Sequence, residues 1–345
     1  MRRSAPALIG VVCIGSVAAL AAQDVRIGII DFYGLKHLSP AALRPALTFK
    51  EGDALTMDGG TRPASLVESE QRLSRVPGVA HARTEIVCCD DGRIIVYVGI
   101  EETDARVLRF RPAPVGSVRL PPEVVKAGED FEDALIAAVQ RGVTGEDQSR
   151  GHALNDDPAE RAIQEGFVEY AQPHVAMLRR VMRESGDAAH RALAAQVIGY
   201  VRDKQAAVAD LVAAMEDPDG KVRNNAMRTL LVFAAAKRGA SPKPPPRVPF
   251  EPFVRYLDSP IWTDRNKASG ALDMLSASRD PALLAALRRD AIAPVAEMAR
   301  WQSAGHARPA FIILARIAGY ADAAAEDAWE RGDRETVITA AENSR

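Results

Sequence analysis

The spacing of apolar positions divides the chain into a front part with a period of two and a longer rear part with a helical period. Residues 25–34 are rich in β-branched and aromatic side chains and end in glycine, as a strand entering a turn does. Residues 82–89 and 93–102 alternate apolar and polar positions. Asp91-Gly92 between these two runs is a strong hairpin signal. The front part therefore predicts three strands, of which the last two form a hairpin.

Two helices are predicted between the first and second strands. Ser39-Pro40 supplies an N-cap followed by proline at the first helical position. The second helix carries Leu66, Leu73 and Val76 on one stripe and ends at Pro77-Gly78. The order β-α-α-β-β predicts an α+β domain in which two helices cover one face of a three-stranded sheet. The apolar Ile95 and Tyr97 indicate that the third strand is central.

Residues 25–102 resemble a POTRA (polypeptide-transport-associated) domain. The likeness is carried by the strand ending in Gly34, the Ser-initiated helix, the Gly52-Asp53 turn, the helix exit Pro77-Gly78-Val79 and the last strand, 93–102. Members of that family act in the cell envelope and bind protein partners, often by adding a strand to the edge of the sheet. The resemblance implies the same kind of partner here, a protein or an extended polypeptide.

The resemblance also makes the second strand the outer partner of the hairpin, and hence the candidate binding edge. A row of unpaired backbone donors and acceptors accepts an extended segment, and alternate side chains add selectivity. The alternative is that Arg83 and Glu85 protect this edge against aggregation. The candidate partner-binding residues are Ala82, Arg83, Thr84, Glu85, Ile86, Val87, Cys88 and Cys89.

The rear part predicts stacked helices. Asp157 is placed to cap a helix that starts at Pro158. Similar small-residue helices then recur around Arg191, Arg223 and Arg265, with a weaker copy in residues 307–320. One such helix cannot bury its apolar stripe alone, so neighbouring copies must stack.

The phrase at 211–230 resembles the HEAT repeat, with matching residues at Leu211, Met215, Asp217, Pro218, Asp219, Val222, Arg223, Ala226 and Leu230. The resemblance implies an all-α, HEAT-like solenoid that presents a long face to other proteins. In such repeats the aspartate caps or braces the turn between helices and the arginine reaches neighbouring repeats. We therefore expect structural roles for Asp217 and Arg223.

The N-terminus adds a location to this picture. Residues 1–22 have a positive start, an apolar run and small residues at the end, the pattern of a secretory signal peptide. Cleavage and export to the periplasm or cell envelope are expected, and a retained membrane anchor is the alternative. The predicted domains are a signal peptide at 1–22, a POTRA-like domain at 24–102, a Pro-rich and polar connector with one helix (130–141) at 103–157, and a HEAT-like repeat domain at 158–340.

Composition and sequence motifs give little indication of a catalytic or ligand-binding site. The formal net charge of −2 disfavours nucleic acid as a partner. The chain has no glycine-rich phosphate loop, nucleophile elbow or paired metal-binding histidines, so neither a cofactor, a metal nor a small-molecule substrate is predicted. Gly151-His152, beside 155–157, is the one polar cluster of note, and we interpret it as a loop with a helix cap. Adjacent strand residues point to opposite faces, so Cys88 is expected in the core and Cys89 as an incidental thiol.

Three functional hypotheses follow. The first is a non-enzymatic interaction scaffold of the bacterial cell envelope. The second is an accessory subunit of an outer-membrane translocation or assembly system, which requires a membrane-embedded partner. The third is an enzyme with its site in the solenoid groove, and it is the weakest because no paired acid, base or nucleophile signature occurs.

Overall fold

The computed structural model describes residues 24–56, 62–105, 108–235 and 246–344, so the predicted signal peptide at 1–22 lies outside the described residues. The described chain forms two compact units. Residues 109–235, 246–253 and 270–278 belong to one, called here the helical unit. The other is called the mixed unit because it holds both a sheet and helices, and its described residues are 24–56, 62–105, 108, 254–269 and 279–344.

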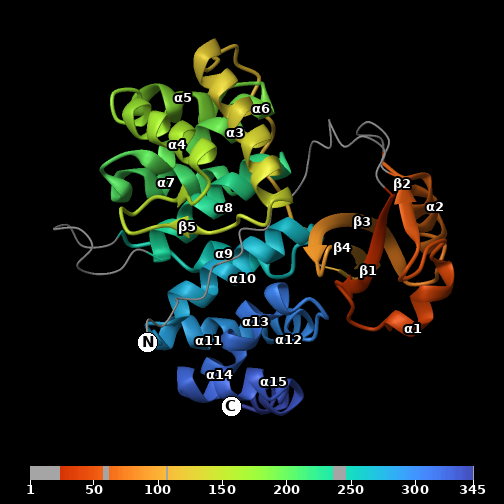
Figure 1. Ribbon diagram of the computed structural model, residues 1–345. Helices are drawn as coiled ribbons and strands as arrows, with labels where there is room; N and C mark the ends of the chain where they lie inside the picture. The colour runs from red at the N-terminus through yellow and green to blue at the C-terminus, as the bar shows by residue number, and fades with distance from the viewer. Residues whose placement is uncertain (1–23, 57–61, 106–107, 236–245, 345) are drawn as a thin grey trace. The chain divides into compact units, whose positions relative to one another are not determined.

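The mixed unit contains a four-stranded sheet in the order β2-β1-β4-β3 (Figure 1). The strands are β1 (Asp24–Tyr33), β2 (Ala54–Thr56), β3 (Val79–Asp90) and β4 (Arg93–Glu102). β4 runs parallel to β1 and antiparallel to β3, so the predicted central position of this strand is confirmed. The sheet has four strands where three were expected, because β2 is only three residues long, too short for a two-residue period to be recognised in the sequence.

Helices cover one face of this sheet, as predicted. They are α1 (Pro40–Leu43), the 3-10 turn η1 (Arg44–Ala46) and α2 (Ala64–Leu73). Ser39 caps α1 by accepting a hydrogen bond from the Ala42 amide, and Pro40 takes the first helical position. Val96 and Val98 of β4 share one apolar core with Leu66 of α2.

The opposite face of β4 is also buried, which the sequence did not predict. The Tyr97 ring stacks on Trp262, with ring centroids 4.9 Å apart, and lies at the same distance from Trp301. The Tyr97 hydroxyl forms a 2.7 Å hydrogen bond with Nδ1 of His306. A strand buried on both faces has a nearly continuous apolar sequence, and β4 has one.

The turn after β1 is held by two residues from helices later in the same unit, Glu297 and Arg265. Gly34 and Leu35 donate their amides to the Glu297 carboxylate at 3.0 and 2.9 Å, and Arg265 donates to it at 2.9 Å. Gly34 has a φ of 84°, and a Cβ there would lie 2.2 Å from the carbonyl oxygen of Ile100. Glycine is therefore required where the strand pattern ends.

The remaining elements are mostly helices (Figure 1). Those of the helical unit are α3 (Pro122–Gln140), α4 (Pro158–Ala171), α5 (Val175–Glu184), α6 (Ala188–Val197), η2 (Ile198–Tyr200), α7 (Lys204–Ala214) and α8 (Gly220–Ala235), with the short strands β5 (Glu146–Asp147) and β6 (Leu154–Asn155). Residues of both units belong to α9 (Glu251–Tyr256) and α10 (Trp262–Ser276). The mixed unit ends in α11 (Pro281–Asp290), α12 (Ile292–Ala299), α13 (Ala304–Ile317), α14 (Asp322–Glu330) and α15 (Arg334–Glu342).

The predicted repeat is visible in three equivalent arginines. Arg191, Arg223 and Arg265 are each at most 2% exposed. Each donates to the carbonyl oxygen of the residue six positions earlier, at 2.9, 2.9 and 2.5 Å respectively. The same bond therefore closes the turn that leads into α6, α8 and α10. The part of the chain after the sheet is mostly helical and repeat-like.

The polar cluster around His152 separates into two features. Asp157 caps α4 by accepting hydrogen bonds from the amides of Ala159 and Glu160, which confirms the predicted cap. His152 lies elsewhere, in the wall of a pocket. Helix α3 begins at Pro122 and not at residue 130 as expected, because the prolines at 121 and 122 take the N-cap and first positions, which proline tolerates.

Among the described residues, no helix combines the length and apolar character that a membrane crossing needs.

Candidate functional site

The predicted binding edge, residues 82–89, lies within β3. This strand is twelve residues long and pairs with β4 alone, so it forms one edge of the sheet as the structure describes it. Thr84 pairs with Val98 and Ile86 with Val96. In an antiparallel pair, backbone groups of alternate residues point toward and away from the partner strand. The position at the edge was expected from the resemblance.

Two charged side chains occupy the middle of this edge. Glu70 of α2 accepts hydrogen bonds from the amide and the hydroxyl of Thr84, at 2.5 and 2.9 Å. Arg62 donates to the Thr84 carbonyl oxygen at 3.0 Å and pairs with Glu70 at 2.6 Å. The backbone of Thr84 therefore points away from β4, and so do the backbones of Ala82 and Ile86, two residues to either side.

The ion pair of Arg62 and Glu70 is called the edge clamp below. Burial by itself would raise the pKa of Glu70, but hydrogen bonds from Arg62 and Thr84 outweigh it and lower that pKa. Glu70 is therefore ionised near neutral pH. Sequence reasoning missed the clamp because its two members precede the strand by many residues and show no pattern related to it.

The charges expected to protect the edge have other partners. Arg83 pairs with Glu101 of β4 at 2.7 Å. Glu85 accepts a 3.0 Å hydrogen bond from the amide of Trp262, and its burial raises its pKa. The side chains that bind the backbone of Thr84 at this edge are therefore those of Arg62 and Glu70.

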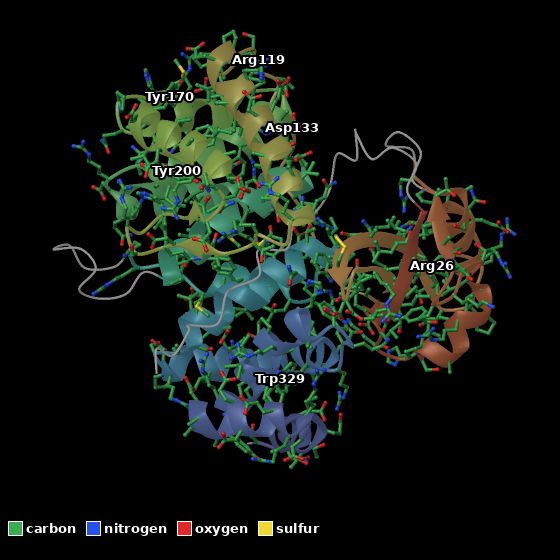
Figure 2. All side chains as sticks on the ribbon, viewed as in Figure 1. Arg26, Arg119, Asp133, Tyr170, Tyr200 and Trp329 are labelled. Carbon is green, nitrogen blue, oxygen red and sulfur yellow. A yellow bond between two sulfur atoms is a disulfide. The ribbon has the colours of Figure 1, made fainter. Side chains whose placement is uncertain are left out.

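The end of the predicted edge differs from expectation. Cys88 and Cys89 form a disulfide, drawn as a yellow bond in Figure 2, and the peptide between them is cis. The expectation of a core residue and an incidental thiol is wrong. That expectation assumed regular alternation, whereas the register of β3 with β4 shifts between Val87 and Asp90.

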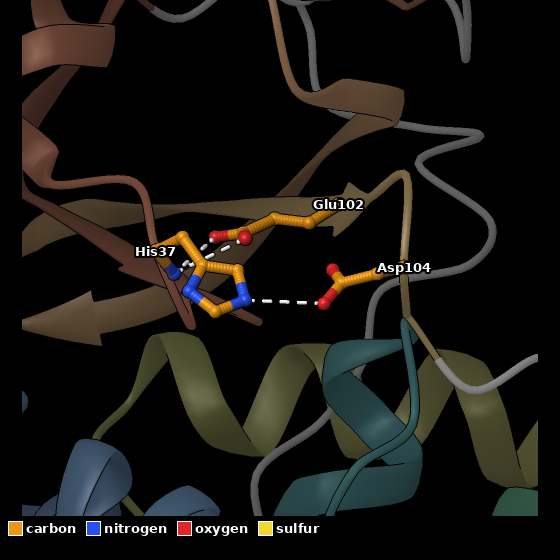
Figure 3. Close-up of side chains that lie close together, drawn as sticks. All are labelled: His37, Glu102 and Asp104. Carbon is orange, nitrogen blue, oxygen red and sulfur yellow. Dashed lines mark hydrogen bonds and ion pairs between the residues drawn. The ribbon is translucent and has the colours of Figure 1, made fainter.

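A second cluster brings together His37, Glu102 and Asp104, whose side-chain atoms are close enough to hold a metal ion (Figure 3). The Glu102 carboxylate already accepts hydrogen bonds from the amides of three consecutive residues, 36–38, at 2.8 to 3.1 Å. His37 Nε2 lies 3.1 Å from the exposed Asp104 carboxylate. Glu102 thus holds the loop after β1, and we assign the cluster a structural role.

Asp217 has the bracing role that the repeat resemblance implied. It accepts hydrogen bonds from the amide of Asp219 in its own turn at 3.0 Å and from the guanidinium of Arg191 at 2.8 Å. Arg223 donates to the carbonyl oxygens of Asp217 and Pro218. Arg191 therefore links neighbouring repeats, and the printed hydrogen bonds of Arg223 hold the turn that precedes its own helix.

Comparison with known protein families and with curated proteins finds no match. Among solved structures, a designed armadillo repeat protein, YIII(Dq)4CqI, is 15% identical, with a TM-score of 0.36 over 57% of this chain and 97% of that chain. Computationally designed armadillo repeat proteins for modular peptide recognition are 16% identical, with a TM-score of 0.38 over 64% of this chain and 97% of that chain. Because these TM-scores are low, neither likeness assigns a fold or a function to this chain.

Proposed function

We propose that this chain is a non-enzymatic protein-interaction scaffold that binds an extended polypeptide along β3. The observation that carries the proposal is the position of β3, a long strand paired on one side only. A polypeptide added there gains main-chain hydrogen bonds over several residues, and alternate side chains select its sequence.

The bound strand would compete with the edge clamp. Arg62 is 52% exposed, so its hydrogen bonds to Thr84 lie close to water and can exchange for those of an incoming backbone. The amide and carbonyl groups of Ala82 and Ile86 face the same side and would extend the new pairing in both directions. The clamp then acts as a reversible cover that prevents non-specific pairing when no partner is bound.

The POTRA-like assignment of residues 24–102 and a cell-envelope location belong to the same proposal. They are supported by the residues shared with POTRA domains and by the secretory pattern at 1–22. Fractionation of cells that express the chain with a C-terminal tag tests the location. Recovery in the cytoplasmic fraction alone would contradict it.

Peptide binding by edge variants tests the function. Binding of the full chain to an array of extended peptides first identifies a probe peptide, and calorimetry then compares variants with the wild type. We expect Arg62→Ala to strengthen binding roughly threefold to tenfold, because about 0.5–1.5 kcal/mol is no longer needed to displace its hydrogen bonds. Ile86→Pro removes an amide that faces the edge and should weaken binding about tenfold.

Arg72→Ala is the matched control, because Arg72 lies on α2 near Glu70 but donates to Pro45 and makes no contact with β3 among its described hydrogen bonds. It should bind the probe peptide as the wild type does. Circular dichroism of each variant verifies that the sheet is intact. Equal affinity of all four proteins would show that the peptide binds elsewhere.

A further inference from the structure

A pocket of approximately 700 Å³ lies in the helical unit. Its walls come from the loop at 150–152, from the end of α4 and from the segment that joins η2 to α7. This volume is within the range of about 300–1,000 Å³ that small-molecule sites occupy. None of the functional roles assigned above uses these residues.

Lys204, the first residue of α7, places an ammonium group in this pocket without a counter-charge. Its Nζ donates to the Gly199 carbonyl oxygen at 2.6 Å and lies 3.4 Å from Nδ1 of His152. It also lies 5.5 Å from the centre of the Phe233 ring. In the described part of the chain Lys204 forms no ion pair with a carboxylate.

Burial, and then the charge of Arg150, lowers the pKa of Lys204 to about 7. A half-buried ammonium group without a counter-ion is unfavourable, and the positive end of the α7 dipole adds to the repulsion. A ligand that brings a negative charge would relieve both effects.

The other charged groups of the pocket are also mostly positive. Arg202 lines it and makes no ion pair among the described residues, while Arg150 pairs with Glu165 at 2.9 Å. Glu169 is the one acidic residue in the described lining. His152 is 8% exposed, and its Nε2 has no hydrogen-bond partner among the described residues. Burial and the nearby Lys204 lower the pKa of His152 to about 4, so its ring is neutral near pH 7.

Apart from Gln172 and Tyr200, the rest of the lining is apolar. Val168, Pro173 and Val201 contribute hydrocarbon surface next to the cationic groups. We propose that this pocket binds a small organic acid, whose carboxylate pairs with Lys204 and Arg202 while its hydrocarbon part contacts these three residues. This function is separate from polypeptide binding along β3 and does not depend on it.

Calorimetry and thermal unfolding of the full chain with hexanoate, benzoate, hexanol and inorganic phosphate test the proposal. Hexanoate or benzoate should bind the wild type and raise its Tm. Hexanol, which lacks the charge, and inorganic phosphate, which lacks the apolar part, should bind more weakly. Lys204→Met and Arg202→Gln should each weaken carboxylate binding about tenfold or more, since a charged hydrogen bond is lost. Without ligand, Lys204→Met should unfold at a higher temperature because it removes a half-buried charge that has no counter-ion.

Lys126→Met is the control, because Lys126 is an exposed lysine of α3 that pairs with Asp130 and does not line the pocket. It should bind carboxylates as the wild type does. Carbon-13 NMR of the Lys204 side chain gives a second readout in the wild type, where hexanoate should raise the pKa of the amine. The proposal is overturned if neither carboxylate binds, if hexanol or phosphate binds as tightly, or if Lys204→Met binds unchanged.

Discussion

Asp217 shows how a single buried charge holds the repeats together. The carboxylate is fully buried and accepts hydrogen bonds from Arg191 at 2.8 Å and from Arg111, in the segment before α3, at 2.6 Å. Burial by itself would raise the pKa of Asp217, but the contacts with Arg191, the Asp219 amide and Arg111 lower it below its usual value.

Asp217→Asn keeps the shape of the side chain and removes its charge. Two guanidinium groups, one of them only 2% exposed, are then left without their counter-ion. We expect the free energy of unfolding to fall by about 3–5 kcal/mol, the usual cost of breaking a buried pair. Urea denaturation followed by circular dichroism measures the change.

Asp130→Asn is the control, because Asp130 forms an exposed ion pair with Lys126, and exposed pairs contribute little to stability. The pH dependence gives a further check. Since the folded-state pKa of Asp217 is lowered, its stabilisation is complete above the unfolded value of 3.8 and is lost as the pH falls through the folded value. The wild type and Asp217→Asn should therefore converge in acid; a constant difference would contradict this account.

Single residues also differ in whether the sequence predicts their roles. The role of Asp217 was expected from the resemblance of residues 211–230 to the HEAT repeat. The clamp of Arg62 and Glu70 and the amine of Lys204 were not predictable, because their partners come from other elements and no local spacing marks them.

At the scale of elements, the Pro-rich segment 109–121 behaves as an extended strip along the turns of the repeats. The Arg111 amide donates to the Glu216 carbonyl oxygen at 2.8 Å. Gly116 exchanges backbone hydrogen bonds with Glu184 and Gly186, at 2.9 and 2.7 Å. The sequence predicted that this segment is irregular. The structure shows in addition that backbone hydrogen bonds hold it against the turns of the repeats.

Gly116→Ala tests this anchoring. A Cβ at Gly116 would lie 2.4 Å from the Glu184 carbonyl oxygen, so the segment must shift. We expect a loss of about 1–3 kcal/mol in the free energy of unfolding, and faster proteolysis within 109–121. Limited proteolysis with mass spectrometry locates the cleavage.

Gly166→Ala is the matched substitution, because Gly166 lies in α4 with nothing within 4 Å of a built Cβ. It should stabilise the chain by up to about 1 kcal/mol through helix propensity. If Gly116→Ala has the same effect as Gly166→Ala, the strip is not held by this contact.

At the scale of the whole molecule, the two units carry different spectroscopic probes. All three tryptophans, Trp262, Trp301 and Trp329, belong to the mixed unit. Fluorescence therefore follows the unfolding of that unit, while circular dichroism follows the helices of both. Unfolding of such a chain need not be two-state, and the two signals should be fitted separately.

Each unit also contains a buried histidine with a lowered pKa. Burial, with Lys267 next, lowers the pKa of His306 to about 4, and His152 has a similar value. The pKa of a histidine in the unfolded chain is near 6.5. Between pH 4 and 6.5 the unfolded chain therefore binds more protons than the folded chain, so stability falls as the pH falls from 6.5 toward 4. Each histidine should contribute a slope of up to about 1.4 kcal/mol per pH unit.

His306→Asn should remove this histidine's contribution to the pH dependence of the unfolding transition that fluorescence detects. His152→Asn should reduce the pH dependence only of the transition that circular dichroism detects. His81→Asn is the control because His81 is exposed in the mixed unit. An unchanged fluorescence profile in His306→Asn would show that acid unfolding of the mixed unit has another origin.

The sequence by itself determined the local elements: the three longer strands, the caps at Ser39 and Asp157, and the repeated helices after the sheet. Each is set by spacing within a few residues, where propensity and periodicity act. Only the tertiary structure decided what covers the second face of β4, which charges close the β3 edge, and which pocket receives Lys204. Those features join residues far apart in the chain, and their energies depend on burial and distance, which a linear pattern does not contain.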